Sequence, residues 1–493
     1  MKKNNLIIYA SVILVLIIGL FLRVYRVDKV LNFYFDQGRD ALVIWDFWHN
    51  GKFFLVGPTT GIAGIFRGPF YYYLIAPVYL IGNGNPTWPA VFLAITAVAA
   101  NVLLYKLAAE IEGKIAGLIA VTIASFSFYI VLAARWLSNP TPMLFLSMAL
   151  IWLMFRAHEK KFWTWPLIAF IAGSSLFHFG SAGEVFYFLA ILIFMIWQRK
   201  KLPPLKYWII SALAFFATFA PLLIFDLRHD GILRNNIFDF LFSRGSFKTS
   251  FWDVAKIRFR FYYDVFTNKL FDYRGPKRTG LIMIMAVFFV ANYQRFLKND
   301  KLKIVVLFLV SPMIGLLFFQ GNYGNIYDYY LTGYYLIFIL FVSVVLARIW
   351  QTIYGKVFVI IFFYYFFTSN FPLVWSRIND NLDGETSIGF KNQLEAIDWI
   401  YKDANGENFN VDFYVPPVIP YAYDYLFNWL GSAKYDYIPD ENLLPTLYTL
   451  YEEDPPHPER LEEWMKRQDG IGVVEKSIKY GGITVQKRVR YEE

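Results

Sequence analysis

Two aspartates four residues apart, Asp36 and Asp40, are the first side chains that could do chemistry. They lie in the run Phe-Asp-Gln-Gly-Arg-Asp-Ala-Leu, and on a helix this spacing puts both carboxylates on one face. A carboxylate in such a position can act as general base on an acceptor hydroxyl. The spacing fits a structural interpretation equally well, in which Asp36 is a helix N-cap and Asp40 a first-turn acid favoured by the helix dipole.

An arginine follows in the same part of the chain, in the run Arg67-Gly-Pro-Phe-Tyr-Tyr-Tyr. Its planar guanidinium can bind a phosphate through paired hydrogen bonds. An isolated arginine beside an apolar segment can also simply extend toward lipid phosphates. Together with the aspartates, it suggests proton transfer at a hydroxyl close to a phosphate.

The composition indicates that these residues are positioned by a membrane protein. Of 493 residues, 57% are hydrophobic and 17% are charged, against roughly 45–50% and about 25% in ordinary globular proteins. A water-soluble fold could not bury so much apolar surface. The same composition excludes disorder, and the absence of cysteine excludes a disulfide scaffold. We therefore expect a polytopic α-helical membrane protein.

Segments of about 20 mostly apolar residues, the length needed to cross a bilayer, predict eleven spans. They are 5–22, 87–105, 115–134, 140–155, 162–177, 182–197, 207–226, 280–294, 304–320, 330–347 and 357–375. A further apolar segment, 69–82, would cover only about 21 Å as a helix and is interrupted by Pro77. We expect it to lie in or dip into the interface; counted as a span, it would make twelve.

Positive charge sets the expected direction of the chain across the membrane. The loops on the N-terminal side, 106–114, 156–161, 199–206, 295–303 and 348–356, are all basic. The N-terminus is therefore expected to be cytoplasmic, in the inner (cytoplasmic) membrane of the cell, with the C-terminal part outside. The external loop 227–279 departs from the pattern with eleven Lys and Arg, but long loops obey it less closely.

Charge also divides the chain into two bodies. Residues 376–493 carry 12 Lys+Arg against 22 Asp+Glu, whereas residues 1–375 carry 35 against 16. We expect a transmembrane domain over 1–375, with external loops 23–86 and 227–279. A small extracytoplasmic α/β domain should follow over 376–493. Within it the pattern predicts a helix over 388–403 and strands at 410–415, 472–475 and 483–488.

The order of these motifs resembles the GT-C glycosyltransferases of the family-39 type, which include protein O-mannosyltransferases and aminoarabinose transferases. Asp36-Gln37 follows the first predicted span, and Arg67-Gly-Pro-Phe-Tyr precedes the second. The run Ala134-Arg-Trp-Leu-Ser-Asn139 comes about seventy residues after Arg67. The resemblance implies inverting transfer of a sugar from a polyprenyl-phosphate donor to an extracytoplasmic protein, lipid or glycan. It favours Asp36 as the base, with Asp40 as second choice, and implies that Arg67 holds the leaving phosphate.

Two residues depart from the family pattern: Gln37 stands in place of the usual Glu, and Asn139 in place of a second Asp. Both changes would weaken a divalent-cation site, so we expect chemistry without a metal or other cofactor. Arg135 and Arg228 are further phosphate-binding candidates, because both are cationic and both are expected on the external side of the membrane. Further candidates for the acceptor site or its wall are Arg39, Asn139, His178, Glu184, Asp230 and Asp328.

Other functions are open from the sequence. A transporter or flippase of a lipid-linked or anionic substrate would place ionisable groups near the bilayer midplane, often on broken helices. Here we assign twelve of the sixteen acids in residues 1–375 to the external side, which favours an enzyme. A lipid-linked polysaccharide polymerase or ligase would share the donor chemistry. The expected partners are the bilayer, the lipid-linked donor and the acceptor, and no nucleic acid.

Overall fold

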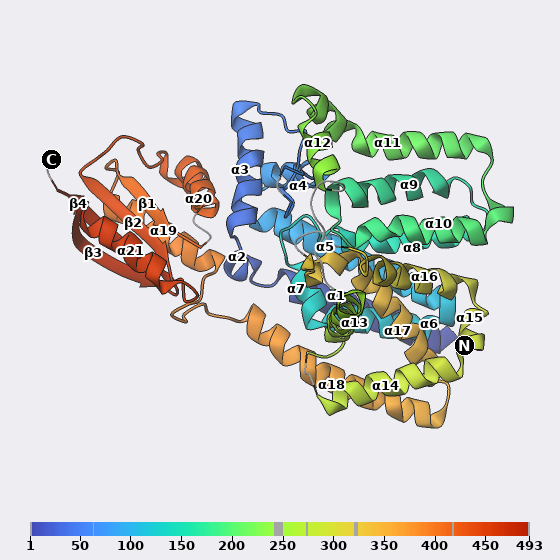
Figure 1. Cartoon of the computed structure of the whole chain (residues 1–493). Coiled ribbons are helices and arrows are strands. Elements are labelled where there is room, and N and C mark those ends of the chain that lie inside the picture. The colour runs from blue at the N-terminus through green and yellow to red at the C-terminus, as the bar shows by residue number, and fades with distance from the viewer. Residues whose placement is uncertain are drawn as a thin grey trace.

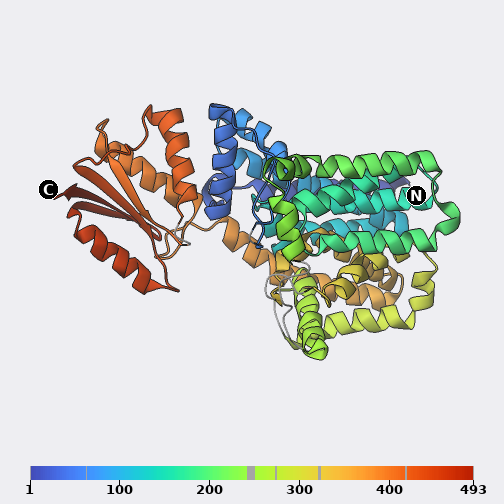
Figure 2. The same ribbon diagram turned by 45° about the horizontal axis from the view of Figure 1, so that its top comes forward.

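The computed structural model describes residues 2–62, 64–240, 250–272, 275–319, 324–416 and 419–491. Parts of the predicted loop 227–279, at 241–249 and 273–274, lie outside the described residues, as does residue 320 of the predicted span 304–320. The described chain forms a bundle of helices with a smaller region, containing a β-sheet, attached to one end (Figure 1). The N-terminus lies at the opposite end of the bundle from that region (Figure 2).

Each segment that was predicted to span the membrane contains a helix. The bundle helices are α1 (Lys2–Val24), α5 (Thr87–Glu112), α6 (Lys114–Phe126), α7 (Phe128–Ala134), α8 (Met143–His158), α9 (Thr164–Ser174), α10 (Tyr187–Trp197), α11 (Leu205–Arg228), α14 (Pro276–Ala291), α16 (Asp300–Gly315), α17 (Tyr335–Ile349) and α18 (Ile353–Ile378). Short π-helical or 3-10 turns flank some of them, at Ser175–Phe179, Glu184–Phe186, Arg199–Lys201 and Asp328–Tyr334.

Length and apolar composition identify fewer spans than eleven. Within the described residues, five helical stretches are long and apolar enough to cross a membrane, or six if α6 and α7 count as one bent span. Several other bundle helices, such as α8 and α10, are apolar but shorter. A polytopic membrane protein is thus confirmed in outline, while the number of eleven spans stays a prediction.

The predicted span 115–134 is not one continuous helix, because α6 and α7 are bent by 70° relative to each other. The break falls at Ser127, whose backbone is extended. Asn370 of α18 compensates for it: its Oδ1 accepts a hydrogen bond from Phe128 N at 2.8 Å. A freed backbone group inside a membrane bundle must find such a partner, so the bend depends on a side chain far away in the sequence.

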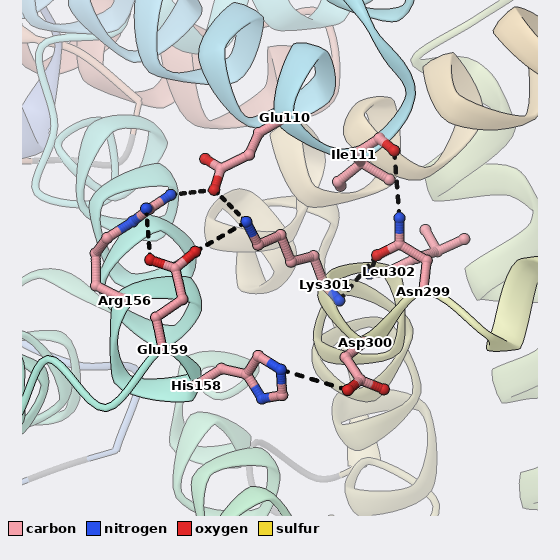
Figure 3. A network of polar contacts seen from close by, with 9 residues as sticks. All are labelled: Glu110, Ile111, Arg156, His158, Glu159, Asn299, Asp300, Lys301 and Leu302. Atoms are coloured by element: carbon pink, nitrogen blue, oxygen red, sulfur yellow. Dashed lines mark hydrogen bonds and ion pairs between the residues drawn. The ribbon is translucent and has the colours of Figure 1, made fainter.

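Charged side chains pair with one another at the end of the bundle that contains the N-terminus (Figure 3). Arg156, at the end of α8, binds Glu159 at 2.7 Å and also binds Glu110 of α5. Lys301, at the start of α16, binds Glu159 at 3.0 Å and also binds Glu110. The network joins three helices at this end, next to the short helix α15 (Tyr293–Leu297).

Shorter helices lie at the other end of the bundle, which we call the cap end. They are α2 (Val27–Val30), α3 (Phe35–Asn50) and α4 (Phe70–Ile81), and α3 runs across the direction of the bundle helices (Figure 1). The expectation that Pro77 interrupts the segment 69–82 is wrong, since α4 continues through it. A proline removes one hydrogen bond and need not end a helix that its neighbours hold in place. The predicted loop 227–279 also contains helices, α12 (Ile232–Phe238) and α13 (Phe251–Asn268).

Residues 379–491, which we call the cap, contain a mixed four-stranded sheet. Its strands are β1 (Asn410–Tyr414), β2 (Thr446–Glu452), β3 (Gly472–Tyr480) and β4 (Ile483–Arg490). Their order is β1-β2-β4-β3, with β1 and β2 parallel and the other pairs antiparallel. The helices are α19 (Phe390–Ala404), α20 (Tyr421–Leu430), which ends in the π-helical turn Gly431–Tyr435, and α21 (Pro458–Asp469). The sequence predicted α19 and three strands but missed β2, α20 and α21.

Alternation along β2 explains why helices cover both faces of the sheet. Tyr448 packs against Trp399 of α19, whereas Tyr451 packs against Trp464 of α21. Successive side chains of a strand point to opposite faces, and these two residues are three positions apart. The helices α19 and α21 accordingly lie on opposite sides of the sheet (Figure 2).

The cap packs directly onto α3. A Cβ placed on Gly38 would lie 2.3 Å from the backbone N of Ala422 in α20, so the two backbones touch at a site where only glycine fits. The ring of Phe35 packs against that of Tyr421 with centroids 5.0 Å apart. Gln393 of α19 donates to Phe33 O at 2.9 Å. Helix α3 is therefore fixed between the bundle and the cap.

Candidate active site

The first turn of α3 is closed by Gln37 and not by Asp36. Tyr34 is the N-cap residue, and its backbone N donates to Gln37 Oε1 at 3.2 Å. Gln37 Nε2 in turn donates to Leu137 O at 3.1 Å, which ties α3 to the segment after α7. The interpretation of Asp36 as an N-cap is therefore wrong, because a neighbouring side chain does this work and leaves the aspartate free for other contacts.

Arg39 lies between the two aspartates and joins them. Its Nη1 donates to Asp36 Oδ1 and to Thr59 Oγ1, each at 2.8 Å. Its Nε and Nη2 donate to Asp40 Oδ1 at 3.1 and 2.7 Å. The expected carboxylate pair is present on one side of α3, with a guanidinium held between its members.

The two aspartates differ in what they can still bind. The side chain of Asp36 is 61% exposed, and that of Asp40 only 7%. Tyr72 of α4 donates a third hydrogen bond to Asp40 Oδ1, at 2.8 Å. Burial raises the pKa of Asp40 to about 6, although the Arg39 charge opposes this rise. Asp40 is thus a buried anchor for Arg39 and Tyr72, while Asp36 is open to a substrate hydroxyl.

Arg67 lies on the loop that adjoins this cluster. Its backbone N donates to Pro58 O at 3.2 Å, one residue before the Thr59 that binds Arg39. Its half-buried guanidinium donates through Nη1 to Gly180 O. Burial lowers the pKa of Arg67, and the nearby Glu184 carboxylate acts in the opposite direction. The fold therefore brings the two predicted motifs, around Asp36 and Arg67, to neighbouring positions.

His178 and Glu184 are buried next to the loop that contains Arg67. Phe70 N donates to His178 Nδ1 at 3.3 Å, and His178 Nε2 lies 2.6 Å from Thr218 O, which it reaches as the donor. The Glu184 carboxylate accepts hydrogen bonds from Ser181 N and from Gly333 N, both at 2.7 Å. Both side chains are fully buried, so they lie beneath the wall of the candidate site and not on its surface.

The other predicted phosphate-binding arginines have separate positions. Arg135 donates to the carbonyls of Leu22 and Tyr25 at the end of α1, at 3.0 and 3.1 Å. Arg228 is exposed at the end of α11. Within the described part of the chain it forms no side-chain hydrogen bond or ion pair, and the same holds for the exposed Asp230.

Asn139 and Asp328 also lie at the cap end. Asn139 donates to Phe179 O at 3.1 Å, next to the turn that holds Arg67. Asp328 binds the buried Lys269 at 2.8 Å and accepts a hydrogen bond from Tyr335. These contacts make both residues part of the framework around the candidate site.

Sequence reasoning missed Tyr72, Thr59 and Lys269 as members of this region. Tyr72 stood inside the Arg67 run, and its position on the helix that follows was the available signal. Thr59 offered no signal, because its contact with Arg39 depends on the tertiary path of the loop 51–69. Lys269 was one of many cations in a long loop.

The position that a divalent cation would take between two carboxylates is filled here by Arg39. Guanidinium nitrogens reach both Asp36 and Asp40 within 2.8 Å. Across the described ranges, no group of three or more His, Cys, Asp or Glu is arranged to hold a metal ion.

Comparisons with known proteins find similarity to one protein family and to several solved structures. Residues 67–225 match a family model described as dolichyl-phosphate-mannose-protein mannosyltransferase. A search of curated protein sequences found no match. The solved structure of ArnT from Cupriavidus metallidurans bound to undecaprenyl phosphate is similar, with a TM-score of 0.60 and 8% identity over 99% of this chain and 98% of that one. The apo state of the same ArnT gives 0.62 and 9% over the same shares.

A more distant structure is similar too. It is the oligosaccharyltransferase AglB from Archaeoglobus fulgidus in complex with an inhibitory peptide and a dolichol-phosphate, with a TM-score of 0.53 and 10% identity over 99% of this chain and 74% of that one. The predicted resemblance to GT-C glycosyltransferases of the family-39 type is thereby confirmed. At these identities the solved structures show a shared fold, and the family model covers the segment that begins at Arg67.

Proposed function

We propose that the protein is a membrane glycosyltransferase that moves a sugar from a polyprenyl-phosphate donor to an acceptor hydroxyl. The observation that carries the proposal is the exposed Asp36 carboxylate, held by Arg39 next to the Arg67 loop. The fold shared with ArnT supports the donor class, because that protein was solved with undecaprenyl phosphate bound. AglB, solved with a dolichol-phosphate and a peptide, supports a lipid-linked donor as well.

In the proposed reaction Asp36 accepts the proton of the acceptor hydroxyl as its oxygen attacks the anomeric carbon. The bond from that carbon to the phosphate oxygen breaks, and the polyprenyl phosphate leaves with an additional negative charge. A single displacement of this kind inverts the configuration at the anomeric carbon. Arg67 stabilises the charge that develops on the leaving phosphate.

Arg39 sets the position of the base. It is itself held by Asp40, which is fixed by Tyr72 and by burial, so the Asp36 carboxylate has a defined direction before substrate binds. Because this guanidinium supplies the positive charge between the carboxylates, we propose that transfer does not require a divalent cation. The rate should then be unchanged by a chelator, and a rate lost with chelator and restored by a metal would contradict this part of the proposal.

We further propose an orientation in the membrane and a compartment for the acceptor. The cap and α3 lie outside the cytoplasm, with the N-terminus inside, and the acceptor is a protein, lipid or glycan of that compartment. Arg228, exposed at the cap end, meets the anionic donor as it approaches. Cysteines introduced one at a time at exposed positions of the cap and of the loop 156–161 test the direction. Reagents that cannot cross the membrane should label only the first set in intact cells.

The test of the function is a transfer assay with the purified full chain in vesicles. Labelled polyprenyl-phosphate sugar is offered with panels of peptide, glycan and lipid acceptors, and both the free polyprenyl phosphate and the anomer of the product are measured. We expect polyprenyl phosphate to be released in step with an inverted product. Movement of intact donor across the vesicle membrane without any product would instead establish a transporter.

A further inference from the structure

A small pocket with two arginines lies at the cap end, lined in part by Trp136. Its volume is about 250 Å³, and Arg135, Arg377, Asn32 and Trp136 line it with apolar residues of α2 and α7. None of the described residues that line it is acidic. Asp36, Arg39, Asp40 and Arg67 are not among its lining residues, so the pocket is distinct from that cluster.

The two arginines of the pocket are not neutralised by carboxylates. Burial, together with the charge of Arg377, lowers the pKa of Arg135 to about 10. The acid nearest to Arg377 is Asp380, with an N–O distance of 3.9 Å and with both side chains about one-third exposed. Such an exposed pair gives little compensation, so two like charges face one small cavity.

Both guanidiniums are held in place and keep free donors. Arg135 is bound by the carbonyls of Leu22 and Tyr25, and Arg377 by Asn32 Oδ1. A guanidinium has five N–H donors in a fixed plane, and these contacts use only some of them. Fixed, positive and partly unsatisfied donors are what an anion such as a phosphate needs.

The place of the pocket indicates where the anion comes from. Beneath it, the ends of α1, α7 and α18 pack together through Leu22, Val131 and Val374. On the outside of the same helix ends, Phe21 and Trp375 are 44% and 47% exposed. Aromatic residues at the ends of spanning helices mark the headgroup level of a bilayer, where a guanidinium can bind the phosphate of a lipid headgroup.

We propose that the pocket between Arg135 and Arg377 binds the phosphate of an anionic membrane phospholipid, with the acyl chains along the exposed apolar faces of α1 and α18. The bound lipid joins the outer ends of three helices at the point where α18 leads into the cap. This site lies beyond the proposed sugar transfer and does not depend on it.

The test is lipid binding to the purified full chain, measured by native mass spectrometry during titration with phosphatidylglycerol, phosphatidylcholine or inorganic phosphate. We expect phosphatidylglycerol to bind in preference to phosphatidylcholine. Arg377→Gln should weaken this binding about tenfold or more, because it removes a charge-assisted contact. Arg260→Gln, at an exposed position of α13, is the matched control and should bind as the wild type does.

A second variant separates binding from folding. Asp380→Asn removes the one carboxylate within 4 Å of the Arg377 guanidinium among the described residues and should strengthen phosphatidylglycerol binding severalfold, which a damaged fold would not do. Unchanged binding in both Arg377→Gln and Asp380→Asn would overturn the proposal. Binding of inorganic phosphate with no preference for the lipid would also overturn it. So would displacement of phosphatidylglycerol by polyprenyl phosphate at equal concentration, because the pocket would then be a binding site for the sugar donor.

Discussion

At the N-terminal end of the bundle, Arg348 binds Glu112 at 2.6 Å, and Arg156 and Lys301 share Glu110 and Glu159 (Figure 3). At the cap end, by contrast, Asp36 and Asp40 share a single arginine, and Asp36 stays 61% exposed. At the N-terminal end these charged groups bind one another, whereas at the cap end the Asp36 carboxylate remains open to a ligand.

The difference teaches how to separate structural charges from functional ones in a membrane bundle. A charge whose partners are complete contributes to stability and has little left to offer a ligand. An exposed charge that one partner holds in place, such as Asp36 beside Arg39, keeps hydrogen-bonding capacity for a ligand. Variants at the cap end should thus change the rate of sugar transfer, whereas variants at the N-terminal end should change the stability of the protein.

The largest effect is expected from Asp36→Asn. The amide keeps the shape but cannot accept the proton, so sugar transfer should fall by about 10²–10⁴-fold, the usual contribution of a general base. The matched control is Asp46→Asn, on the same helix, where the partly exposed aspartate binds Asn50 and Lys52. Full activity in Asp36→Asn would remove Asp36 from the mechanism and with it the contrast between the ends.

Arg67→Ala should have the next largest effect. Loss of a cation at the leaving phosphate is expected to lower the transfer rate about 100-fold, by analogy with other groups that stabilise developing negative charge. Arg67→Lys should restore part of the rate, since it returns the charge without the planar guanidinium. Measured rates that are equal for the alanine and lysine variants would show that Arg67 acts only through its contact with Gly180.

The pH dependence of transfer sharpens the comparison within α3 itself. The pKa of Asp40 is raised to about 6 by burial, so the carboxyl becomes protonated, and loses its hold on Arg39, as the pH falls below that value. We expect the wild-type rate to decrease below about pH 6. In Asp40→Asn the transfer rate should be about tenfold lower than in the wild type at neutral pH. The further decrease below about pH 6 should be absent. A decrease in rate below pH 6 that persists in Asp40→Asn would have to come from the titration of another group.

The smallest effect on activity is expected at the N-terminal end. Glu110→Gln removes one shared carboxylate from the network with Arg156 and Lys301, and Glu159 still binds both cations. Thermal unfolding in detergent should show a loss of about 1 kcal/mol, as for partly exposed ion pairs, while transfer stays near the wild-type rate. A large loss of transfer without a loss of stability would mean that this end is also functional.

Features that depend on composition and local spacing could be predicted from the sequence. The membrane class, the helices of the bundle and the acidic cap follow from apolar length and charge, and Asp36 and Asp40 do share one side of α3. The run that starts at Arg67 was also recognisable. These are properties of short segments, for which periodicity is a direct physical signal.

Features that depend on distant partners could not be predicted. The bend at Ser127 needs Asn370, and the role of Arg39 needs Thr59 and Tyr72, none of which is near in sequence. Strand β2 was missed because both faces of it are buried, so the alternation that marks a half-exposed strand is absent. The pocket between Arg135 and Arg377 likewise exists only once α7 and α18 are packed together.

The close approach at Gly38 has a consequence for engineering the protein. Because the backbones of α3 and α20 touch there, the cap is not an exchangeable module that can be swapped for the soluble part of a relative by joining chains after α18. A chimera that places any side chain or a differently curved segment against Gly38 would tilt α3 and turn Asp36 with it. Hybrid enzymes with new acceptor preferences should therefore transfer α3 and the cap as one unit.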